Sequence, residues 1–94
     1  MEERKINTDF ADAFKERTKK QCVAIIKFLK TIKSNEEIIV IKDQLIKSST
    51  STAANYRAAC RAKSPADFIA NLGIVNEEAD ETVFLVRSIN GLGL

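Results

Sequence analysis

Apolar residues recur every three to four positions along most of the chain, and this pattern predicts three long helices. In the first segment, Phe14, Ile25 and Leu29 fall on one side of a helical wheel and lysines occupy the other side. This helix is therefore expected to be amphipathic with a basic outer face. We predict one domain over residues 1–94, with helices over about 9–33, 35–62 and 65–90.

The expected helix boundaries are based on capping signals. Ser34 and Glu37 have the spacing of a capping box in front of the second helix. Ser64 followed by Pro65 offers a capping hydroxyl and then a proline at the first helical position, where its missing N–H has no cost. Gly91 is the expected left-handed stop of the third helix.

Small residues dominate the stretch "SSTSTAANYRAACRAK", residues 48–63, which suits a flexible linker, a catalytic serine loop or a surface that packs closely against another helix. The seam positions of the second and third helices are spaced alternately by four and three residues. Folding the chain at Lys63 brings these positions together, so we favour a packing seam whose hydroxyls bond carbonyls of their own helix or a partner. The predicted seam contains Leu45, Ser49, Thr52, Tyr56, Phe68, Leu72, Val75, Ala79 and Thr82.

Several apolar residues lie off this seam, among them Ile39, Val40 and Ile46 on the second helix and Ile69 and Val83 on the third. Three helices leave part of this surface without cover, which indicates a missing fourth helix or a second subunit. The expected fold class is all-α, an antiparallel up-down helical bundle.

The composition and the charge distribution limit both the fold class and the kinds of partner that the protein could bind. The chain has three Gly and one Pro, which favours long helices over a β domain. Its net charge is +2, but residues 1–63 carry +6 and residues 64–94 carry −4. This asymmetry suits either neutralisation within the molecule or a basic surface for a polyanion. The residues of that candidate surface are Lys15, Lys19, Lys20, Lys27, Lys30, Lys33, Arg57, Arg61 and Lys63.

Signals for catalysis are weak. The sequence has no histidine, and the acidic cluster Glu77–Glu81 is interpreted as seam-edge hydrogen bonds and ion pairs, with a divalent metal as the less favoured alternative. Cys22 and Cys60 are expected to be free thiols. We therefore expect no enzymatic activity, metal, cofactor or small-molecule substrate. No export signal or membrane-spanning run is visible, which favours a cytoplasmic protein.

Four short elements occur in order within residues 44–86: Leu45 and Ser48, then Ala54–Ala59, then Ser64, Asp67 and Phe68, then Glu78–Thr82. With these elements the segment resembles the bacterial four helix bundle protein family, also described as the 23S rRNA intervening-sequence protein family. The resemblance implies an antiparallel up-down bundle that forms ring-shaped homo-oligomers, commonly pentamers, and has a fourth helix that is expected to be missing here. A relative of that family, the accessory variability determinant of diversity-generating retroelements, is a basic pentamer that binds a reverse transcriptase and nucleic acid.

These observations together predict a non-enzymatic, self-associating bundle that acts as a nucleic-acid-binding or scaffolding accessory protein. The expected partners are further copies of the chain and RNA or DNA. The alternative is a protein–protein adaptor that binds no nucleic acid.

Overall fold

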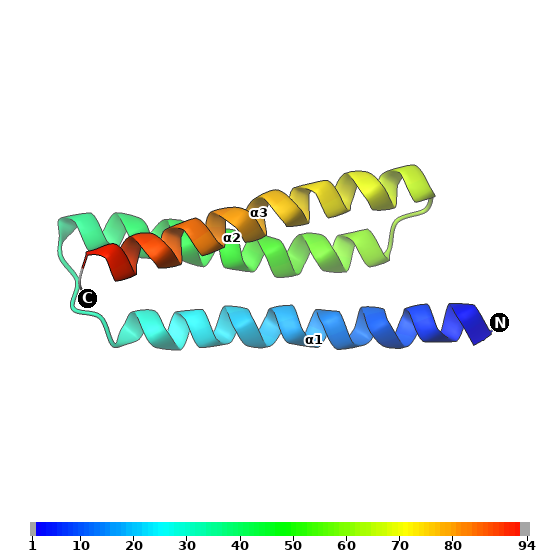
Figure 1. The fold of residues 1–94 in the computed structure, drawn as a ribbon, viewed down its shortest axis with the longest axis horizontal. Helices are drawn as coiled ribbons and strands as arrows, with labels where there is room; N and C mark the ends of the chain where they lie inside the picture. The colour runs from blue at the N-terminus through cyan, green and yellow to red at the C-terminus, as the bar shows by residue number, and fades with distance from the viewer. Residues whose placement is uncertain (1, 93–94) are drawn as a thin grey trace.

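A computed structural model describes the backbone of residues 2–92 and the side chains of residues 9–92. Figure 1 shows three helices: α1 (Glu2–Lys30), α2 (Glu36–Cys60) and α3 (Pro65–Gly91). The described residues form no strand, which confirms the all-helical fold class. The molecule is elongated, 52 Å long and 21 by 17 Å across.

The start of α1 and the end of α3 differ from the expected boundaries. α1 begins at Glu2 rather than near residue 9, because the Glu, Arg and Lys residues before Asn7 are good helix formers. Gly91 does not adopt the predicted left-handed conformation. It is the last residue of α3, and Leu92 follows as the C-cap with a φ of −82°.

The cap of α2 also differs from the expectation. Asn35, not Ser34, is the N-cap, and its side chain accepts a hydrogen bond of 2.9 Å from the Ile38 N–H. Ser34 instead accepts a bond of 2.8 Å from the Lys42 ammonium, which also donates to the Ile32 carbonyl near the end of α1. The connection between the helices extends to residue 35 because α1 already ends at Lys30.

The predicted start of α3 is confirmed. Ser64 has an extended backbone, and its hydroxyl accepts a bond of 3.1 Å from the Asp67 N–H, with Pro65 at the first helical position. These groups satisfy an N–H that would otherwise lack a partner at the helix terminus.

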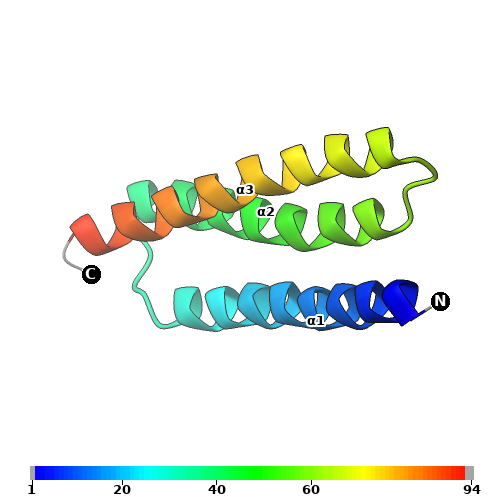
Figure 2. The same ribbon diagram turned by 45° about the vertical axis from the view of Figure 1, so that its right-hand side comes forward.

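α2 is the central helix, and α1 and α3 each pack against it (Figures 1 and 2). The main apolar core lies at the end where α1 finishes, α2 starts and α3 finishes. There Leu29, Leu45, Leu85 and Ile89 form a buried cluster with one residue or more from every helix. Side chains of α1 and α3 therefore meet at this end.

The middle of the bundle is polar but saturated with hydrogen bonds. The Thr82 hydroxyl bonds the Ser48 hydroxyl at 2.9 Å across the α2–α3 interface and the Glu78 carbonyl at 2.8 Å. The Thr52 hydroxyl bonds the Ser48 carbonyl. Within residues 9–92, no buried side-chain nitrogen or oxygen lacks a partner. The small hydroxyl residues therefore serve close packing, as the sequence predicted.

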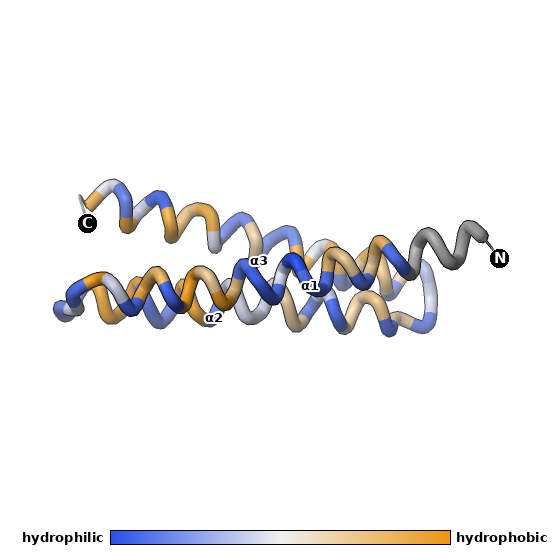
Figure 3. Tube along the Cα trace, turned by 90° about the horizontal axis from the view of Figure 1, so that it is seen from below, coloured by the Kyte–Doolittle hydropathy of each residue, from blue (hydrophilic) through white to orange (hydrophobic). Residues whose placement is uncertain are grey.

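Apolar side chains also remain outside this core. Hydrophobic residues recur along α2 and α3 in Figure 3, and some of them face solvent. Ile39, Val40, Ile46, Ile69 and Val83, which the sequence pattern placed off the seam, are all exposed. Three helices thus leave apolar surface uncovered.

Candidate functional site

Five of the predicted basic residues are exposed lysines on or just after α1. Lys19 and Lys20 line a shallow hollow together with Lys27, with Val23 between them. At about 100° per residue, Lys20 and Lys27 lie opposite the buried Thr18 and Leu29, whereas Lys19 and Lys30 lie on the flank of α1. We call this set the basic row; its members are Lys19, Lys20, Lys27, Lys30 and Lys33.

Lys15 does not belong to the row. It is half-buried and lies 3.8 Å from the Asp12 carboxylate, one turn earlier on α1. Arg57 and Arg61 are exposed at the end of α2, and Lys63 is exposed in the connection to α3. Lys15 and Lys63 both line a groove at the end of the bundle opposite the main core, so the structure brings these two residues to one site.

The predicted seam residues differ in their surroundings. Leu45, Tyr56, Val75 and Thr82 are buried between helices. Ser49 is buried too, but its hydroxyl lies 3.9 Å from the Cys22 sulfur of α1, so it packs on the α1 side of α2 rather than in the α2–α3 seam. Its neighbour Ser48 instead makes the contact with α3, because adjacent helical residues point about 100° apart. Thr52, Leu72 and Ala79 are half-buried.

Phe68 departs most from the seam prediction. Its side chain is 40% exposed, whereas the spacing placed it in the packed interface. The reason is its position in the first turn of α3, where it borders an open groove instead of a fully packed layer.

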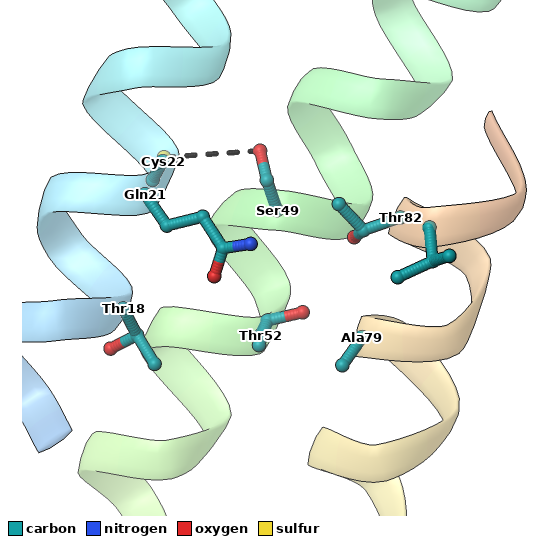
Figure 4. Close-up of a pocket in the computed structure, with 8 residues that line it drawn as sticks. Thr18, Gln21, Cys22, Ser49, Thr52, Ala79 and Thr82 are labelled. Carbon is teal, nitrogen blue, oxygen red and sulfur yellow. Dashed lines mark hydrogen bonds between the residues drawn. The ribbon is translucent and has the colours of Figure 1, made fainter. Parts of the chain in front are cut away.

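A small groove of about 80 Å³ lies where all three helices meet in the middle of the bundle (Figure 4). Gln21 and Cys22 of α1 point toward Ser49 and Thr52 of α2, with Ala79 of α3 on the far side. The residues that line this groove include no carboxylate, amine or imidazole to act as a base. Ser49 bonds its own helix at the Ile46 carbonyl, so the geometry is that of packing rather than of an activated nucleophile.

The acidic cluster on α3 makes no ion pair with Lys47. The sequence predicted ion pairs between this cluster and the seam edge, but Lys47 pairs instead with Asp43 at 3.0 Å, one turn earlier on α2. Among the residues that the structure describes, no three His, Cys, Asp or Glu side chains are grouped to hold a metal ion. Cys22 and Cys60 are free and half-buried.

Tyr56 has the one strongly perturbed acid–base equilibrium of the described residues. Burial, then a side-chain hydrogen bond with Cys60, raises its pKa from 10.0 to about 12. Its ring packs on Phe14 of α1 with 4.6 Å between ring centroids. Tyr56 therefore joins α2 to α1 near the end opposite the main core.

Comparison with known proteins gave no match to a family model, a curated protein or a solved structure. The resemblance to the four helix bundle protein family stays a prediction. None of the described helices combines the length and apolar character needed to cross a membrane.

Proposed function

We propose that this protein is a non-enzymatic, self-associating helical bundle whose basic row binds nucleic-acid phosphates. The observation that carries the proposal is the exposure of the row, because all five lysines face solvent along α1 and just beyond its end, and Lys20 and Lys27 lie on the side opposite the core. The ion pairs found within residues 9–92 involve Lys15 and Lys47, neither of which belongs to the row. The charge of the row is therefore available to a polyanion.

The length of the row suits a phosphate backbone. Lys19 and Lys30 are separated by eleven residues, or about 16 Å at the rise of an α-helix. One strand of a duplex carries about five phosphates over that distance, at roughly 3.4 Å each along the axis. Contacts of this kind position a protein on nucleic acid without reading its sequence.

The exposed apolar residues support self-association. Val40 of α2 is 55% exposed and Phe84 of α3 is 66% exposed, and neither is covered by another helix of the chain. Further copies would bury this surface, and the proposed architecture is an antiparallel up-down bundle of the four-helix type. The resemblance described above supports both the architecture and a ring-shaped assembly.

A salt titration with charge-matched variants tests nucleic-acid binding. Binding of labelled RNA and DNA is measured by fluorescence anisotropy at several salt concentrations for the wild type, for Lys19→Ala/Lys27→Ala and for Lys47→Ala/Arg87→Ala. The first variant should weaken binding and reduce the slope of log K against log salt by about 2, because each phosphate contact contributes about 0.9 for duplex DNA. The second variant removes the same charge outside the row and should leave the slope nearly unchanged.

Equal slopes for the two variants would show that net charge, not the row, governs binding. Absence of binding by an assembled protein would favour the adaptor alternative, in which the exposed apolar residues of α2 and α3 contact other proteins.

A further inference from the structure

A large groove lies at the end of the bundle opposite the main core. Its volume is about 780 Å³, and it lies between the third and fourth turns of α1, the last turns of α2 and the start of α3. We call it the end groove. It is the volume of a small-molecule site, for which about 300–1,000 Å³ is typical. The seam prediction missed it because the interface was expected to stay packed as far as Phe68.

Aromatic side chains lead from the mouth of the end groove to its floor. Phe10 is 66% exposed and Phe68 is 40% exposed, although both belong to the lining. Phe10 stacks on Phe14 at 6.1 Å, and Phe14 in turn packs on the buried Tyr56. Leu72 and Ala59 add aliphatic surface. An apolar or aromatic body in the groove would cover side chains that now face water.

The charges in the lining favour a negative ligand. Asp12 and Lys15 pair with each other, which leaves the exposed Lys63 as the unneutralised charge of the lining. Among the described residues, Lys63 makes no ion pair. The groove therefore combines an apolar interior with one cation at its rim.

The volume favours a small molecule over a helix from another protein. A helix about 10 Å across would fill 780 Å³ within about two turns. A longer docked helix would extend beyond the residues that line the groove. We propose that the end groove binds a small amphipathic anion, with its apolar body between Phe10, Phe68 and Leu72 and its acidic group paired with Lys63.

Two fluorescent probes with nearly the same aromatic body test this proposal. 8-Anilinonaphthalene-1-sulfonate carries a sulfonate, and N-phenyl-1-naphthylamine is its neutral counterpart. Both should bind saturably, once per chain, with enhanced emission. Lys63→Glu should weaken binding of the sulfonate probe by roughly two- to fivefold, the size of an exposed ion-pair effect, and leave binding of the neutral probe unchanged. Phe68→Ser should weaken the binding of both probes.

Two substitutions outside the groove provide controls, one for the apolar contact and one for the charge. Ile69→Ser removes a large apolar side chain that is 67% exposed and lies outside the lining, and Lys47→Glu reverses a distant exposed charge. Neither should change the affinity of either probe. Circular dichroism and thermal unfolding identify any variant that has lost its fold.

Three results would overturn the proposal. The first is non-saturable binding of both probes. The second is equal loss of affinity in Phe68→Ser and Ile69→Ser, which would indicate general surface binding. The third is a fall in molar mass caused by Phe68→Ser, together with no probe binding to the wild type, because a second copy would then occupy the groove. None of these results depends on nucleic-acid binding, so the two proposals fail independently.

Discussion

At the scale of single residues, Tyr56 determines how the fold responds to high pH. Its pKa is raised from 10.0 to about 12 by burial and by the hydrogen bond with Cys60. The folded protein thus holds the phenol proton more tightly than the unfolded chain does. This contribution to stability is complete below pH 10 and is lost as the pH rises from 10 through 12.

Tyr56→Phe tests this contribution because phenylalanine keeps the ring that packs on Phe14. At neutral pH the variant should be less stable by about 1 kcal/mol, the usual cost of a lost hydrogen bond. Above pH 10 the stability of the wild type should fall toward that of the variant or below it, as measured by urea unfolding at a series of pH values. Lysine deprotonation affects both proteins and cancels in the difference.

The same effect is visible by spectroscopy. Tyr56 is the only tyrosine and the sequence contains no tryptophan, so the ultraviolet absorbance of tyrosinate reports on this residue alone. The folded protein should titrate with a midpoint clearly above 10. A midpoint at 10, or parallel stability curves for the two proteins, would contradict the account.

At the scale of helices, the N-cap of α2 is a point where the structure differs from the sequence prediction. Asn35→Ala removes the side chain that accepts from the Ile38 N–H and should lower the free energy of unfolding by about 1 kcal/mol. Ser34→Ala should cost less, because Ser34 is exposed and bonds only the Lys42 ammonium. Chemical denaturation of both variants decides the order, and Ser64→Ala at the start of α3 serves as the positive control. A larger loss of unfolding free energy in Ser34→Ala than in Asn35→Ala would contradict this assignment and support the predicted capping box.

The sequence predicted helices well where local chemistry decides them. Ser64 and Pro65 define the start of α3 by themselves, and the hydroxyls of the small-residue stretch find partners within their own helix. The sequence was less informative where three-dimensional packing decides. The choice between Ser34 and Asn35 depends on Lys42, which reaches back from α2.

The candidate sites show the same division. The exposed face of α1 follows from helical periodicity, so the lysines of the basic row could be predicted. The half-buried position of Lys15 and its ion pair could not. The end groove was not, because it arises from the spacing of three helices. Neither Phe10 nor Phe68 carries a local signal that tells a groove residue from a seam residue.

At the scale of the whole molecule, two helices pack against one central helix, and this arrangement cannot enclose all the apolar side chains of the protein. Val40 on α2 and Phe84 on α3 are more than half exposed, yet both are large and apolar. Monomeric proteins tolerate scattered residues of this kind, whereas assembled proteins bury them. The molar mass in solution separates these two cases.

We expect light scattering on a sizing column to give a discrete multiple of 10.5 kDa at micromolar concentration. Val40→Glu should shift the mass toward the monomer and weaken assembly more than tenfold, because an unpaired carboxylate is costly to bury in an interface. Thr50→Glu is the matched control, since it places the same charge at an exposed polar position of the same helix. Equal effects of the two variants would indicate charge repulsion rather than an apolar interface. A wild type that stays at 10.5 kDa would show that three helices suffice alone, and ring-based functions would then not apply to this chain.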